Sequence, residues 1–245
     1  MAHCMFTGIV RLLAFAGFAM TATVLHAQAG AVADYRFNHS LADSLGLSPP
    51  LTRLLANDGS FLPVTVDGTA TTMLTFSAGA GLQLPVAGVL DGDVYSIAVL
   101  MRFEQTQNWA KIIDTVDLTI DDGIYATVET VELYPSGEQG NDEAFLSGQW
   151  YQLVVTRSLD GLTRVYVDGV LQLSHDDLES GYMAFSQEKL LTFFRDDEDT
   201  ANSENSAGAV ARIRLFDRAL DPGEVAALEP NRVGEVIFRN GFELP

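Results

Sequence analysis

The stretch WYQLVVTRSLDGLTRVYVDGVLQL, residues 150–173, decides the fold. Its first part, Trp150–Arg157, is rich in aromatic and β-branched side chains, which favour a pleated, half-buried surface. Asp160-Gly161 and Asp168-Gly169 each supply a tight turn, because glycine adopts positive φ without strain. The segments after these turns place alternate side chains on one face: Thr163, Val165, Val167, Leu171 and Leu173. The stretch therefore predicts three antiparallel strands joined by two hairpin turns.

The rest of the chain predicts further strands and one helix. The longest strand is Tyr95–Phe103, whose alternate residues from Tyr95 onward form a core face. Pro222–Leu228 predicts a short helix with Asp221 as its cap and Glu224 completing a capping box. The fold class is thus all-β, an antiparallel two-sheet jelly-roll sandwich with one short C-terminal helix. The other expected strands are Ala31–Phe37, Met73–Phe76, Gly81–Leu84, Lys111–Thr115, Ile124–Val128, Val131–Tyr134, Leu190–Phe194 and Ala209–Phe216.

Two segments resemble laminin-G-like domains of the concanavalin A-like lectin/glucanase superfamily. One is the Trp-led strand followed by the YVDG hairpin. The other is Val210–Leu228, VARIRLFDRALDPGEVAAL, which matches a closing strand, the letters D-R-A-L and a short helix. An F-x-x-x-L-x-D-S opening is matched at Phe37, Leu41, Asp43 and Ser44. The resemblance implies an exported bacterial binding or adhesion module more than an enzyme.

The N-terminus predicts an address outside the cytoplasm. Arg11 precedes an apolar run from Leu12 to Leu25, and Ala27-Gln28-Ala29 fits a small-x-small cleavage site. Residues 1–29 are therefore expected to be a signal peptide, although an uncleaved anchor is the alternative. Residues 30–228 form the expected β-sandwich domain, and residues 229–245 an expected tail ending in IFRNGFE. We expect a secreted, periplasmic or cell-surface protein of a Gram-negative bacterium, with no stable membrane insertion.

The charge of the chain excludes some partners. The formal net charge is −19, and Lys111 and Lys189 are the only lysines. Nucleic acid is a poor partner for such a protein, whereas divalent cations are plausible ones. The single cysteine, Cys4, leaves with the predicted signal peptide, so the mature chain would hold no disulfide. The alternative is that the acidity only keeps an exported protein soluble.

The densest polar segment is Arg195–Gly208, RDDEDTANSENSAG. Calcium takes six to eight oxygen ligands, which such a loop can offer. Laminin-G-like relatives hold calcium at a rim with acids from separate loops, so the resemblance also implies calcium here. The expected ligands are Asp196, Asp197, Asp199 and Glu204, with Asp122 from a second acidic segment that includes Asp114, Asp117 and Asp121. The alternatives are a solvated acidic loop and, for the second segment, simple turn chemistry.

Three residues are candidates for contact with a ligand. Trp109, flanked by polar residues, offers a ring for sugar stacking, although core packing is the alternative. Arg212 and Arg214 alternate with apolar residues and therefore share one face of a strand. The alternative for both arginines is pairing with nearby acids on a solvated face. The expected partner is a glycan or a cell-surface or matrix protein.

Catalysis has little support in the sequence, and we expect no catalytic residues. Concanavalin A-like glucanases carry a Glu-x-Asp-x-x-Glu strand, which this chain lacks, and only His39 and His175 follow the predicted signal peptide. The predicted function is an exported, non-catalytic binding or adhesion module, assisted by calcium. The alternatives are a glycan-active hydrolase of the same superfamily and a purely structural envelope or matrix protein.

Overall fold

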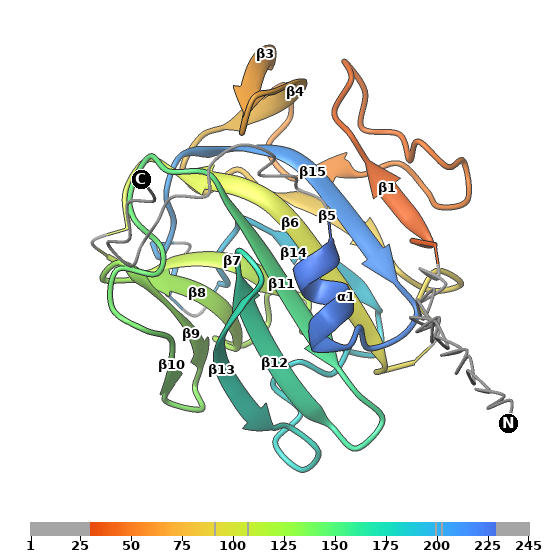
Figure 1. Ribbon diagram of the computed structural model, residues 1–245, viewed down its shortest axis with the longest axis vertical. Helices are drawn as coiled ribbons and strands as arrows, with labels where there is room; N and C mark the ends of the chain where they lie inside the picture. The colour runs from red at the N-terminus through yellow and green to blue at the C-terminus, as the bar shows by residue number, and fades with distance from the viewer. Residues whose placement is uncertain (1–29, 91, 107, 199, 202, 229–245) are drawn as a thin grey trace, which may run out of the picture.

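The computed structural model describes residues 30–228 except 91, 107, 199 and 202. The predicted signal peptide and the predicted tail lie outside the described residues. The described chain folds into two antiparallel sheets packed face to face, with one short helix (Figure 1). No helix among these residues is both long and apolar enough to span a membrane. The predicted all-β sandwich is confirmed.

The first sheet contains eight strands. Seven follow the spatial order β13-β12-β11-β6-β15-β4-β3, and β1 pairs with the second half of β15. These strands are β1 (Ala33–Tyr35), β3 (Phe61–Val66), β4 (Thr69–Phe76), β6 (Tyr95–Phe103), β11 (Tyr151–Arg157), β12 (Leu162–Val167), β13 (Val170–Asp176) and β15 (Gly208–Phe216).

The second sheet contains seven strands in the order β10-β9-β8-β7-β14-β5-β2. They are β2 (Thr52–Arg53), β5 (Leu82–Pro85), β7 (Ala110–Asp114), β8 (Gly123–Thr127), β9 (Thr130–Tyr134), β10 (Glu138–Gln139) and β14 (Leu190–Phe193). Side chains from the inner faces of both sheets form one apolar core. The predicted core face of β6 is confirmed, because all five of its residues are fully buried: Tyr95, Ile97, Val99, Met101 and Phe103.

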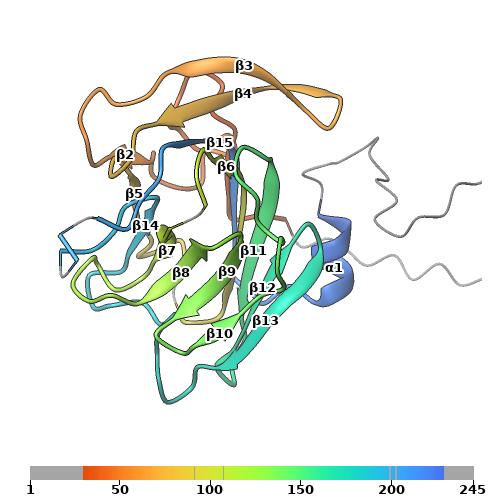
Figure 2. The ribbon, with the colours of Figure 1, turned by 90° about the vertical axis from the view of Figure 1, so that its left-hand side faces the viewer.

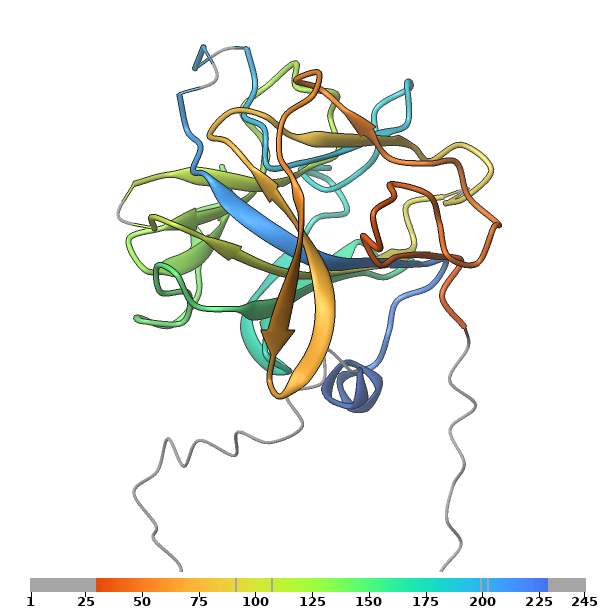
Figure 3. The ribbon, with the colours of Figure 1, turned by 90° about the horizontal axis from the view of Figure 1, so that it is seen from above.

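The outer face of the first sheet is also covered. The helix α1 (Pro222–Ala227) lies against this face (Figure 3). Its Val225 belongs to one apolar cluster with Ala98 of β6 and Val154 of β11. The β3–β4 hairpin forms the far end of this sheet (Figure 2). Its Val66 belongs to a small apolar cluster with Leu100 of β6. Strand β6 is therefore covered on both faces, which explains why Ser96, Ala98 and Leu100, which alternate with its core residues, are buried as well, while Arg102 is half-buried.

The stretch at 150–173 forms β11, β12 and β13, as predicted. Asp168 and Gly169 both have positive φ, 51° and 77°, in the turn between β12 and β13. One expectation is wrong: Leu171 does not share the core face of Leu173 and is 46 % exposed. A β-bulge causes this, because Val165 pairs with Leu173 while its neighbour Tyr166 pairs with Leu171. The extra residue in β13 turns Leu171 outward.

Candidate functional site

A buried cluster of acidic side chains surrounds the ammonium group of Lys111. Lys111 lies in β7 on the outer face of the second sheet, since its neighbours Ala110 and Ile112 belong to the core. Its Nζ atom lies 2.9 Å from Asp197 Oδ2, 3.4 Å from Asp114 Oδ2, 3.7 Å from Asp196 Oδ1 and 3.9 Å from Asp121 Oδ1. Lys111 is only 1 % exposed. One cation therefore serves four carboxylates.

Two loops bring these carboxylates over the sheet. Asp114 is the last residue of β7 and Asp121 belongs to the β7–β8 connection, whereas Asp196 and Asp197 follow β14. The loops also bond to each other and to the sheet through the backbone. The Glu198 N–H donates to the Leu118 carbonyl at 3.3 Å, and the Lys111 N–H donates to the Glu204 carbonyl at 3.0 Å.

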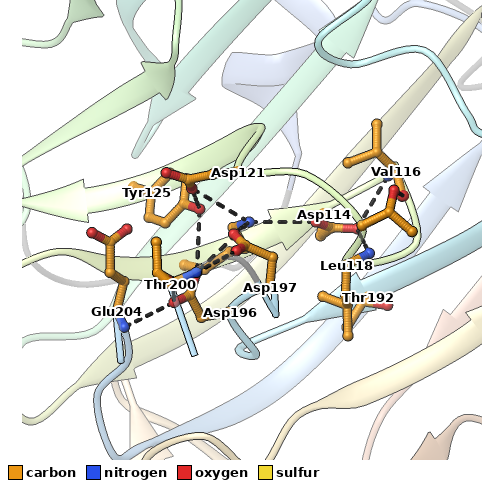
Figure 4. Close-up of polar contacts among 12 residues, drawn as sticks. Asp114, Val116, Leu118, Asp121, Tyr125, Thr192, Asp196, Asp197, Thr200 and Glu204 are labelled. Carbon is orange, nitrogen blue, oxygen red and sulfur yellow. Dashed lines mark hydrogen bonds and ion pairs between the residues drawn. The ribbon is translucent and has the colours of Figure 1, made fainter. Parts of the chain in front are cut away.

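The buried carboxylates accept further hydrogen bonds from uncharged donors. Burying a carboxylate is costly unless its oxygens are paired, so these donors matter as much as the lysine. They are the Val116 and Leu118 N–H groups to Asp114 at 3.1 Å each, the Thr200 N–H to Asp197 at 3.1 Å, the Glu204 N–H to Asp196 at 2.9 Å, the Thr200 hydroxyl to Asp196, and the Tyr125 hydroxyl to Asp121 and Asp196 (Figure 4).

Negative charge exceeds positive charge in the cluster, and pKa values shift accordingly. Burial raises the pKa of Asp114 to about 6, although Lys111 opposes that shift. Burial, with the charges of Asp121 and its acidic neighbours, raises the pKa of Glu204 to about 7. Burial also acts upward on the pKa of Asp197, but the hydrogen bonds from Lys111 and the Thr200 N–H, together with the charge of Lys111, outweigh burial and hold that pKa at about 2.

The predicted metal ligands come together only in part. Asp196 and Asp197 lie inside the cluster and Glu204 at its half-buried edge, while Asp122 is half-buried in the adjoining loop, where burial raises its pKa. Asp199 lies outside the described residues. Carboxylate oxygens of Asp121, Asp196 and Asp197 all lie within 4.8 Å of one another, so the donor set has the chemistry that calcium prefers. This geometry does not test the expectation of calcium, and the ammonium of Lys111 already lies among these oxygens.

Sequence reasoning missed the residues at the centre of the cluster. The sequence predicts that Lys111 and Tyr125 lie in strands, but it predicts no functional role for either. The sequence does contain a usable signal. The chain has only two lysines, and one of them lies in an apolar strand. A lysine buried in such a strand requires an acidic partner. The sequence also left open whether the two acidic segments meet, and the structure brings them together.

Trp109 lies beside this cluster in a partly exposed aromatic corner. Its ring meets those of Tyr125 and Tyr134 edge-on, with centroids 5.4 Å apart in both pairs. The Lys111 ammonium also lies 4.8 Å from the Tyr125 ring centroid. Trp109 and Tyr134 are half-buried, whereas Tyr125 is fully buried. Tyr125 therefore links the aromatic corner to the acidic cluster.

Arg212 and Arg214 lie elsewhere, on the outer face of the first sheet. Arg212 donates two hydrogen bonds to Asp34, at 2.8 and 3.0 Å, and Arg214 donates to Gln152 at 3.0 Å. Both line a cavity of about 260 Å³ next to α1. The three predicted ligand-contact residues therefore do not form one site. The pairing of Arg212 with an acid matches the alternative reading from the sequence.

Several solved structures share this fold. Domain 4 of AbnA, a GH43 extracellular arabinanase from Geobacillus stearothermophilus solved with arabinotriose, is 19 % identical, with a TM-score of 0.61 over 80 % of this chain and 97 % of that one. The ligand-binding domain of botulinum neurotoxin serotype D, solved with N-acetylneuraminic acid, is 12 % identical, with a TM-score of 0.58 over 80 % of this chain and 50 % of that one. The receptor-binding domain of botulinum neurotoxin type G is 15 % identical, with a TM-score of 0.55 over 80 % and 50 %.

These identities are low, so the likeness shows the fold alone. The chain spans about half the length of the neurotoxin domains that it matches. No curated protein matches the sequence. A family model, however, matches residues 76–226, more than half of the chain, and it describes the Laminin_G_3 group of the concanavalin A-like lectin/glucanases superfamily. The chain belongs to that superfamily.

Proposed function

We propose that this protein is an exported, non-catalytic module that binds a glycan, either free or on a surface protein to which it adheres. Membership of a lectin/glucanase superfamily supports a carbohydrate partner. The sugars present in the AbnA and neurotoxin D structures support the same class of ligand. Export rests on the predicted signal peptide, and a mature protein that begins at Gly30 in the culture medium or periplasm would agree with it.

The observation that carries the proposal is the half-exposed Trp109 beside a polar loop. Sugar rings stack on aromatic faces, and their hydroxyls bond to carboxylates and amides at the edge. Beside Trp109 the chain offers Tyr134 as a second ring. Tyr125, which also meets Trp109, links this corner to the acidic cluster, at whose edge Glu204 is a half-buried carboxylate. The Gln139 amide donates to Glu132 Oε2 at 2.5 Å in the neighbouring strands. We assign the glycan site to this corner.

A titration of tryptophan fluorescence with arabinan and sialyl oligosaccharides tests the proposal. The chain has two tryptophans, and Trp150 packs on the first sheet, so Trp150→Phe leaves Trp109 as the only reporter. We expect a saturable change in that variant. In the native background, Trp109→Ala should weaken binding at least tenfold, roughly 1.4 kcal/mol, while Trp109→Phe should retain most of it. Binding that is unaffected by Trp109→Ala would place the glycan elsewhere.

One observation favours a hydrolase as the second candidate. Glu204 is half-buried and its pKa is raised to about 7, as is typical of a general acid. The nearby Asp196 and Asp197 are buried and hydrogen-bonded, so neither is exposed to act as the second carboxylate. We therefore expect no release of reducing ends from these oligosaccharides. Turnover that Glu204→Gln abolishes would make the protein an enzyme.

A further inference from the structure

We infer that Lys111 is the resident cation of this site, in the position where oxygen-rich loops hold a divalent metal ion. Its ammonium fastens the β7–β8 connection and the loop after β14 to the second sheet. The arrangement makes the native site independent of calcium. It also makes Lys111 a positioning residue for the aromatic corner, a consequence that rests on the proposed function.

The first argument is geometric. Four carboxylates, one from the end of β7 and three from two loops, converge on the single Nζ atom at 2.9 to 3.9 Å. These are ammonium–carboxylate distances, whereas calcium binds oxygen at about 2.3–2.6 Å. An ammonium has three donors, and here they face Asp197, Asp114 and the Asp196–Asp121 side. The cage therefore has the dimensions of a lysine head group.

The second argument is electrostatic. Asp114, Asp196 and Asp197 are at most 1 % exposed, so water cannot screen their mutual repulsion. Lys111 is the cation within 4 Å of them among the described residues. Removal of one partner from a buried charged group is strongly destabilising, because the remaining charges stay buried without compensation. The loops therefore require a cation, and Lys111 supplies it.

The third argument concerns the carboxylate oxygens that would be left without a cation if the lysine lost its charge. Three carboxylate oxygens, from Asp121, Asp196 and Asp197, already lie within 4.8 Å of one another. A side chain of lysine length without charge would leave these oxygens facing one another with no cation. A divalent ion would then be the species best able to neutralise them. The inference thus predicts that loss of the lysine charge creates calcium binding that the native protein lacks.

The variant Lys111→Met tests this prediction, because methionine keeps most of the length and removes the charge. We expect the native melting temperature to be the same in millimolar calcium and in chelator. Lys111→Met should melt about 10 °C lower in chelator and recover part of that loss in calcium. Lys189→Met is the matched control, since Lys189 is the only other lysine; it should respond to calcium as the native protein does.

Terbium luminescence gives an independent readout, because Tyr125 beside the cage would sensitise a bound ion. We expect a signal from Lys111→Met, and none from the native protein or Lys111→Arg. If Lys111→Met fails to fold, the double variant Lys111→Met, Asp197→Asn, which also removes an acid, should fold and melt alike with and without calcium. A native protein that calcium stabilises through Asp197 would overturn the inference, and so would a Lys111→Met variant that melts like the native protein in chelator.

These melting and luminescence measurements do not involve a glycan. Their failure is therefore distinct from failure of the proposed function. If both hold, Lys111→Met should weaken glycan binding in chelator and regain it in calcium. If only the glycan assay fails, Lys111 remains the resident cation of a loop with another role.

Discussion

At the scale of single residues, Asp43 explains one of the motifs by which the sequence resembles its family. Its buried carboxylate accepts four backbone hydrogen bonds, from the N–H groups of Asp34, Leu45, Leu47 and Ser48, at 2.8 to 3.1 Å. Burial acts upward on its pKa, but these bonds outweigh burial and lower the value. Ser44 follows with a hydroxyl that donates to the Asp34 carbonyl at 2.6 Å. The D-S pair therefore closes the loop after β1.

We predict that Asp43→Ala lowers the free energy of unfolding by about 2–4 kcal/mol, because several N–H groups lose a charged acceptor. Asp43→Asn keeps one acceptor oxygen and should lose clearly less. Urea denaturation followed by circular dichroism measures both. Equal losses in the two variants would mean that packing, rather than hydrogen bonding, holds this loop.

The same scale shows why the centre of the site was not predicted. Asp196 and Asp197 stood out in the sequence, because acids crowd one loop. Lys111 did not, because a single lysine in a strand carries no periodic pattern. Its role depends on two loops about 80 residues apart meeting over β7, and side-chain spacing along one strand contains no information about that meeting.

At the scale of elements, the closing segment shows how local signals determine structure. Asp221 caps α1 and Glu224 completes the capping box, as predicted. Glu224 also forms two hydrogen bonds of 2.6 Å with Arg218, which is the arginine of the D-R-A-L letters. Ser96 of β6 donates to the Arg218 carbonyl and accepts from the Leu220 N–H. The segment is therefore fixed to the sheet as well as capped.

We predict that Glu224→Ala destabilises the protein by about 1–2 kcal/mol, more than the roughly 1 kcal/mol expected for Asp221→Ala. Glu224→Ala removes both the capping-box acceptor and the partner of Arg218. Glu224→Gln retains the capping box and should lie between the native protein and Glu224→Ala. Thermal melts would show these as shifts of a few degrees. The idea fails if Asp221→Ala is the most destabilised of the three.

Other elements had weaker local signals. Strand β3 was missed because it contains Pro63 and carries exposed residues, as an edge strand can. The two-residue strands β2 and β10 are too short to show alternation. The Asp168-Gly169 turn, by contrast, was predicted correctly because positive φ at both positions is a local requirement.

At the scale of the whole molecule, the excess of acid makes stability depend on pH in a particular direction. In the folded protein Asp114 holds its proton to about pH 6 and Glu204 to about pH 7, against 3.8 and 4.5 for the ordinary groups. Between the ordinary pKa of each group and its raised pKa in the folded protein, the folded state binds more protons than the unfolded state. The free energy of unfolding therefore falls as pH rises from about 4 to about 7.

Other carboxylates act in the opposite sense at lower pH. Asp197 has its pKa held at about 2, and the pKa values of Asp34 and Asp43 are also lowered, because hydrogen bonds to their charged forms outweigh burial. These groups stabilise the fold above the unfolded pKa of 3.8, and that contribution is lost as pH falls toward their folded values. The two sets together place maximum stability in mildly acidic solution.

We therefore predict a melting temperature that is highest near pH 5, falls toward pH 8 and falls again below pH 4. Glu204→Gln and Asp114→Asn should each flatten the alkaline side, since neither amide can ionise. Asp117→Asn is the control, because it alters an acid of the same connection outside the set that contacts Lys111. Calorimetry across pH 3 to 9 in chelator measures the profile. The melting temperature could instead rise steadily to pH 8 in the native protein and equally in all three variants. That result would show that Lys111 and the hydrogen-bond donors fully neutralise the cluster.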